Sequence, residues 1–141
     1  MLEGGGRVLV DERSLWPDGR FVTTHLVVRT AYLRAQPEIV ARLLRAHLAA
    51  VDFANASAAE ARALSNAAIE RVTGQAIAPA VLERAWSALT FTVDPIAASL
   101  RKSAADATAA GLLDPVDLAG IYDLGPLDAV LAAAGRPPVP R

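Results

Sequence analysis

The order of strand-like and helix-like segments constrains this chain more than any single motif. Residues 8–12 (VLVDE) form a short β-branched run after a glycine cluster, and residues 21–30 (FVTTHLVVRT) are rich in Val and Thr without a breaker. The second run does not alternate cleanly between apolar and polar residues, which favours a strand that is buried on both faces. Two strands do not make a stable sheet by themselves. The sequence therefore predicts a fragment, or a subunit that pairs with something else.

Helix signals dominate the rest of the chain. Alanine, the strongest helix former, supplies 31 of the 141 residues. The sequence WPDG at 16–19 predicts a turn between the two expected strands. We expect a short helical turn over 31–36, a short extended piece over 90–93, a further short turn from 114, and helices over 37–55, 57–73, 79–89, 94–110 and 126–134.

Capping residues set the expected ends of these helices. Ser57 with Glu60 predicts a capping box, and Asp94 followed by Pro95 predicts an N-cap before the first helical residue. Gly74 predicts the end of the helix that Ser57 opens. The Pro-rich sequence at the end of the chain, RPPVPR at 136–141, predicts an extended, frayed tail.

Charge and composition exclude several classes of function. A formal net charge of -1 provides no electrostatic basis for binding nucleic acid or an anionic membrane. The chain has no cysteine, which excludes disulfides, thiol catalysis and zinc–cysteine sites, and its 2 histidines are too few for a histidine-rich metal site. No segment approaches the roughly 20 apolar residues that cross a bilayer. We expect neither a cofactor nor a metal, and we expect no enzymatic activity.

An ordered set of segments resembles a known protein family. The run GGRVLVDERSLWPDGRFVTTHLVVRTAYLRAQPEIVARLLRAHLAAVDFAN is similar to the later half of ABC-transporter solute-binding proteins of the aliphatic sulfonate, nitrate and taurine type. The segments WSALTFTVDPIAASLRKSAADATAAGLL and DLAGIYDLGPLDAVL are similar to the same group. The resemblance covers about residues 3–135 and rests on the order of the segments, since none of them is a sharp fingerprint.

The resemblance implies a type II periplasmic binding protein, in which two α/β lobes enclose the ligand. Residues 1–135 would form its C-terminal portion, an α/β fragment dominated by five or six helices with about two N-terminal strands, and residues 136–141 a Pro-rich tail. The implied function is to capture a small anion such as an alkanesulfonate, nitrate or taurine and to deliver it to an ABC permease in the membrane. The family's N-terminal half would supply the other wall of the cleft. The implied location is periplasmic or at the cell surface, although the sequence begins without a signal-peptide pattern.

Two groups of residues are candidates for contact with the anion. Thr23, Thr24 and His25 offer hydroxyl groups and a protonatable ring on the longer expected strand, where Thr23 and His25 share one face and Thr24 takes the other. The alternative is that the threonines are simply strand formers and that His25 lies at a sheet edge.

The second group lies further along the chain. Thr90 and Thr92 come just before an expected helix N-terminus, which is a favourable place for an anion, although the carboxylate of Asp94 would compete there. Trp16 could form a wall of the cleft or could pack against its own domain.

Two other classes of function stay open. A thiamine-pyrimidine synthase group shares the expected fold, but its site contains cysteine, which this chain lacks. The chain could also be a small helical protein-interaction module or a non-functional gene fragment. An exposed apolar patch where a missing lobe should pack would favour the fragment.

Overall fold

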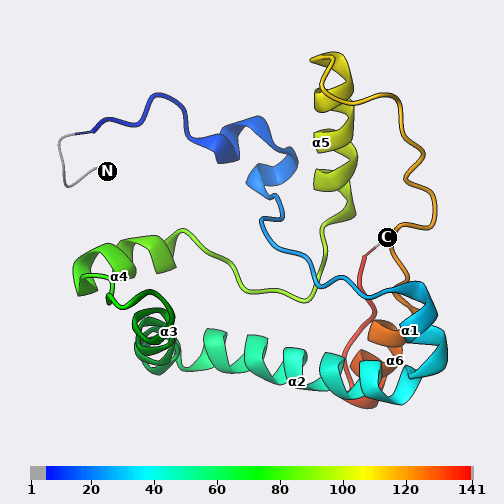
Figure 1. The fold of residues 1–141 in the computed structure, drawn as a ribbon, viewed down its shortest axis with the longest axis horizontal. Helices are drawn as coiled ribbons and strands as arrows, with labels where there is room; N and C mark the ends of the chain where they lie inside the picture. Colours follow the sequence, from blue (N-terminus) through cyan, green and yellow to red (C-terminus); the bar gives the residue numbers. More distant parts are fainter. Residues whose placement is uncertain (1–5, 141) are drawn as a thin grey trace. The chain divides into compact units, whose positions relative to one another are not determined.

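The computed structural model describes residues 6–140, which divide into two compact units (Figure 1). Unit 1 combines residues 6–29 with 94–124 and Pro140, and unit 2 combines Thr30–Val93 with Gly125–Val139. Two short 3-10 helices and six α-helices are present in the described residues: η2 (Glu12–Leu15), η3 (Pro17–Gly19), α1 (Thr30–Ala35), α2 (Pro37–Ala56), α3 (Ala58–Thr73), α4 (Pro79–Ser87), α5 (Ala97–Ala109) and α6 (Gly125–Ala133).

The expected α/β fold class is wrong, because residues 6–140 contain helices and no strand. Residues 8–12 and 21–30 are the expected strands. Residues 8–11 and 21–29 are irregular, Glu12 belongs to η2, and Thr30 begins α1. A strand needs a neighbour that pairs its backbone N–H and C=O groups. Within the described part of the chain, residues 23–28 make no backbone–backbone hydrogen bond, so their β-branched composition alone does not produce a strand.

The predicted turn at WPDG is confirmed as the 3-10 helix η3, which directly follows η2. The side chain of Asp11 accepts a hydrogen bond from the Arg13 backbone N–H and opens η2. Within η3, Asp18 has a φ of 54° and Gly19 a φ of 66°, so the chain passes through the left-handed region at both residues. Asp and Gly are among the residues that tolerate this region best.

The long helix α2 organises unit 2. Pro37 stands at its first turn, as expected, and its apolar stripe buries Val40, Leu48 and Val51. Helices α1, α3 and α6 all pack against α2. The buried apolar side chains of the described residues are concentrated here: Val40, Leu48, Val51, Ala61, Leu127, Val130, Leu131 and Val139.

Of the two predicted N-caps, Ser57 has the expected position without the capping hydrogen bond and Asp94 is wrong, whereas a predicted C-cap is confirmed. Ser57 precedes α3 but makes no side-chain capping hydrogen bond, so the expected capping box with Glu60 does not form. Asp94 is not the N-cap of α5, because the helix begins at Ala97. The Asp94 carboxylate instead accepts a hydrogen bond from the Ile96 N–H at 2.8 Å, which closes a turn before the helix. Gly74 ends α3 with a φ of 79°, as its position predicted.

The Pro-rich segment after α6 is not frayed, contrary to expectation, over residues 136–139. Val139 is only 6% exposed, and its backbone N–H donates to the Asp128 carboxylate at 3.2 Å. The Arg136 guanidinium pairs with the Asp52 carboxylate of α2 at 2.7 Å. This segment therefore adds one apolar residue and two polar anchors to the core of unit 2.

Replacing Val139 by Asp should lower the free energy of unfolding by about 2 kcal/mol, because it buries an unpaired carboxylate in an apolar site. The matched control is Val72→Asp, since Val72 is 81% exposed and the same change there should cost little. Urea unfolding followed by circular dichroism measures both. Equal losses in the two variants would show that the segment does not pack on unit 2.

Candidate functional site

A groove of about 740 Å³ lies in unit 1 between α5 and the irregular segment that follows it. One face of α5 supplies mostly small apolar side chains, and Figure 1 shows the chain returning beside this helix after residue 110. The groove is lined by Ala97, Leu100, Arg101, Ala104, Ala105, Thr108, Ala109, Pro115, Val116, Asp117, Leu118, Ala119, Ile121 and Tyr122. Its wall is therefore mainly apolar and carries a few polar groups, as small-molecule sites commonly do.

Of the predicted site residues, His25 is the one that contacts a residue lining this groove. Its Nε2 atom lies 2.9 Å from the hydroxyl oxygen of Tyr122, a groove-lining residue 97 positions further along the chain. The two ring centroids are 5.8 Å apart. Burial raises the pKa of Tyr122 above its ordinary value of 10.0, the charge of Arg101 acts in the opposite direction, and that of Asp94 adds to the rise. Tyr122 is therefore a neutral hydroxyl at physiological pH.

Ser99 fixes the segment that carries His25 onto α5. Its hydroxyl accepts a hydrogen bond from the Val22 backbone N–H at 3.3 Å and donates one to the Ile96 carbonyl at 2.8 Å. Ser99 is 4% exposed, and no buried side-chain polar atom lacks a hydrogen-bond partner in the described residues. Sequence reasoning missed Ser99, Arg101 and Tyr122, because a Ser or Arg in an Ala-rich helix and a Tyr in a loop carry no local signal of a shared site.

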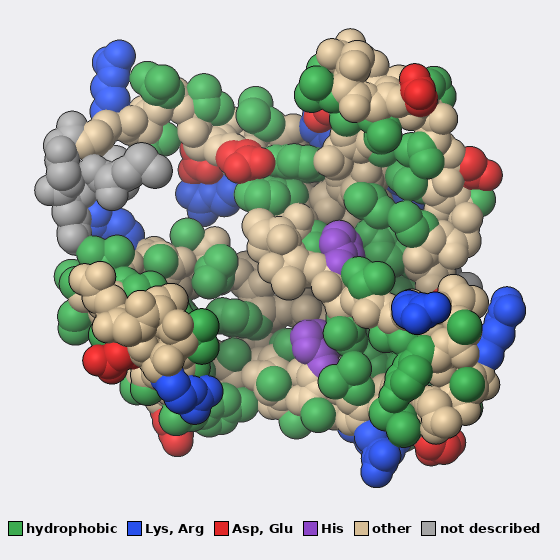
Figure 2. All heavy atoms as spheres, in the orientation of Figure 1, with side chains coloured by type: hydrophobic (Ala, Val, Ile, Leu, Met, Phe, Trp, Pro, Cys, Tyr) green, Lys and Arg blue, Asp and Glu red, His purple; other side chains and the backbone are tan. Residues whose placement is uncertain are grey.

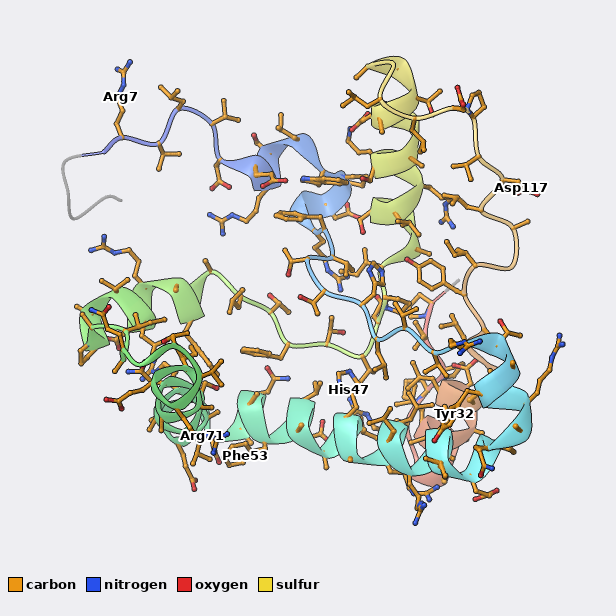
Figure 3. The ribbon with its side chains drawn as sticks, in the orientation of Figure 1. Arg7, Tyr32, His47, Phe53, Arg71 and Asp117 are labelled. Carbon is orange, nitrogen blue, oxygen red and sulfur yellow. The ribbon has the colours of Figure 1, made fainter. Side chains whose placement is uncertain are left out.

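The groove contains two charged side chains of opposite sign that do not pair with each other. Neither Arg101 nor Asp117 forms an ion pair within residues 6–140. Asp117 lies on the segment after α5 (Figure 3), and its carboxylate accepts a hydrogen bond from the Ala119 N–H at 2.8 Å. Asp117 is thus held in a local turn. Among the described residues that line the groove, Arg101 is the cation that forms no ion pair.

The other predicted residues of the N-terminal segment do not line the groove. Thr23 and Thr24 are exposed, and neither side chain makes a hydrogen bond within the described chain. Trp16 stacks on Phe21 with ring centroids 5.2 Å apart, and the Lys102 Nζ atom lies 5.6 Å from its ring centroid. Trp16 therefore packs within unit 1, which fits the structural alternative for this residue.

Thr90 and Thr92 belong to unit 2, whereas His25 belongs to unit 1. Thr90 is exposed and Thr92 is half-buried. Between them, Phe91 packs against Trp86 with ring centroids 4.7 Å apart, and its carbonyl accepts a hydrogen bond from the Asn55 amide at 3.1 Å. This piece of chain is held in place by unit 2, and its expected role in anion binding stays a prediction.

Two further features were sought in residues 6–140. No cluster there brings together three or more side chains of the His, Cys, Asp and Glu types. None of the helices in that range is long and apolar enough to cross a membrane. His47, the other histidine, lies half-buried on α2 in unit 2 (Figure 3).

The raised pKa of Tyr122 leads to a direct prediction. The chain has 2 tyrosines, so a Tyr32→Phe variant leaves Tyr122 as the only one. Its absorbance at alkaline pH should titrate above the ordinary tyrosine value of 10.0, because burial disfavours the phenolate. The folded state holds this proton more tightly than the unfolded chain, so folding stability should fall as the pH rises above 10.0. A midpoint at or below that of a free tyrosine peptide would contradict the burial of Tyr122.

Comparisons of the chain with family models, curated proteins and solved structures found no match. The resemblance to ABC-transporter solute-binding proteins therefore rests on the quoted sequence segments alone. A function for the chain must be argued from those segments and from the groove beside α5.

Proposed function

We propose that this chain contributes the substrate-binding component of an ABC importer for a small anion, with the α5 groove as the binding site. Two observations support the proposal. The ordered segments over residues 3–135 resemble that class of protein, and the groove presents a guanidinium group in a mainly apolar wall. Arg101 is exposed, and its guanidinium stays charged at any physiological pH, so it can attract an anion from solution.

Arg101 is the residue on which the proposal depends. It lines the groove and forms no ion pair within the described residues, so its charge is available to a ligand. The donor fork of a guanidinium matches the oxygen atoms of a sulfonate or a nitrate. Ala104 and Ala105 leave room beside it for a short alkyl group. The groove thus suits a small anion with or without a short apolar tail.

In this proposal a further protein segment supplies the second wall of the cleft. Small-molecule sites usually bury most of the ligand surface, whereas this chain offers the walls formed by α5 and residues 115–122. Large apolar side chains that are exposed on unit 1 are available for such a contact, among them Leu26, Val27 and Leu112. Figure 2 shows hydrophobic side chains on the visible surface over α5. Delivery to a membrane permease, in the periplasm or at the cell surface, follows from the resemblance.

The test is isothermal titration calorimetry of the full chain with propane-1-sulfonate and with nitrate at neutral pH. We expect binding to the wild-type chain and at least about tenfold weaker binding to an Arg101→Gln variant, since a charge-assisted hydrogen bond contributes about 1.5–3 kcal/mol. The matched control is Arg42→Gln on α2, because Arg42 is exposed and belongs to unit 2.

Two results would contradict the proposal. Equal weakening by Arg101→Gln and Arg42→Gln would show that any binding is a general effect of charge. Absence of binding by a folded wild-type chain would remove the groove as a binding site of this chain and would favour the alternative of a helical interaction module. That alternative is favoured by the number of exposed large hydrophobic side chains, and it predicts a folded chain without a small ligand.

A further inference from the structure

The Tyr122 hydroxyl and His25 form a pair at the edge of the groove, and a hydroxyl has only one proton to donate. Tyr122 lines the groove, and its oxygen lies 2.9 Å from the His25 Nε2 atom. If Nε2 carries no proton, the hydroxyl donates to the imidazole, and its proton is not available to a ligand. If Nε2 carries a proton, the imidazole donates to the phenolic oxygen, and the hydroxyl proton can turn towards the groove.

We propose that Tyr122 is a hydrogen-bond donor to the bound anion and that His25 is the positioning residue that controls this donor by its protonation. The inference rests on the proposed function, because it concerns the same groove. Anion binding would then favour the forms in which Nε2 carries a proton, which are the neutral Nε2–H tautomer and the imidazolium. Of these two, the imidazolium also places a positive charge near the anion. By linkage, the anion should bind more tightly as the pH falls through the range in which histidines titrate.

Charged groups of both signs lie near the pair. Arg101 on α5 lines the groove with Tyr122 and acts on its hydroxyl electrostatically. Asp94, from the segment before α5, also acts on Tyr122, and its carboxylate lies 3.7 Å from the guanidinium of Arg20 on the segment that carries His25. Asp117 also lines the groove, and Asp123 follows Tyr122 in the chain, so cations and anions both belong to the surroundings of the pair. A protonated His25 adds one positive charge to this set, and a bound anion would balance it.

Ser99 keeps this arrangement in place. It holds the Val22 backbone N–H at 3.3 Å, three residues before His25, and it belongs to the same helix as Arg101. The imidazole therefore approaches Tyr122 from an anchored segment. His25 and Tyr122 both belong to unit 1. A proton that moves on or off the His25 Nε2 atom can therefore change the direction of their hydrogen bond without moving the backbone.

The experiment measures the affinity of the full chain for propane-1-sulfonate by calorimetry between pH 5.5 and pH 8.0. A sulfonate stays ionised over this range, so any pH dependence belongs to the protein. We expect binding to the wild-type chain to be about fivefold tighter at the acidic end, which corresponds to about 1 kcal/mol for one added hydrogen bond. Titrations in buffers of different ionisation enthalpy should also show net proton uptake on binding.

Variants separate this mechanism from its alternatives. His25→Gln should abolish the pH dependence and the proton uptake, whereas His47→Gln, which changes the only other histidine, should leave both intact. Tyr122→Phe should weaken binding at acidic pH and flatten the pH profile. Thermal unfolding by circular dichroism establishes that each variant is folded, and the buffer experiment needs no variant.

Three outcomes would overturn the inference. Affinity for propane-1-sulfonate that is the same at both ends of the pH range excludes the coupling, although the proposed function would stand. A pH dependence that survives in Tyr122→Phe shows that His25 acts by its charge alone and not through the hydroxyl. Absence of binding at every pH removes the inference together with the proposed function, and Arg101→Gln then has no effect to measure.

Discussion

The hydroxyl of Ser99 makes the contacts on which the organisation of unit 1 depends. It joins the irregular segment after η3 to the first turn of α5, by accepting from Val22 N–H and donating to the Ile96 carbonyl. A buried hydroxyl that satisfies two backbone groups is costly to remove, because each group would lose its partner in a site with little water. This pair of bonds holds residues 21–25 against α5. Without it, His25 would have no fixed position relative to Tyr122 and the groove.

Unit 2 is stabilised in a different way, by apolar contacts around one long helix. Val40, Leu48 and Val51 of α2 are buried, and Leu127, Val130 and Leu131 of α6 are buried in the same unit. The segment after α6 adds Val139 to this core and anchors Arg136 on Asp52. Burial of apolar area is the main stabilising contribution in such an arrangement. Unit 1, by contrast, buries little apolar surface and exposes Leu9, Val27 and Leu112, which is consistent with a need for a partner.

The groove combines one cation, one carboxylate and one phenol with a wall that is rich in alanine. Arg101 supplies charge, Tyr122 supplies a single proton, and the small side chains of α5 leave space between them. No catalytic constellation is required for such a site. The hydroxyl of Tyr122 is held by His25, and the segment that carries His25 is held by Ser99 through Val22.

The sequence by itself determined the helical part of this protein, apart from its exact N-terminal caps. Pro37, Pro79 and Gly74 mark helix ends locally, so the positions of α2, α3 and α4 could be inferred within a few residues. The sequence also indicated His25 as a candidate site residue, although it placed this residue on a strand that does not form.

Only the tertiary structure decided the rest. A strand exists only if another segment pairs with it, so the composition of residues 21–29 could not decide its conformation. The site brings together His25, Ser99, Arg101 and Tyr122, which are up to 97 positions apart, and no local pattern records a contact over that separation. The buried Val139 shows the same limit, because a Pro-rich segment is ordered or frayed according to what it packs against.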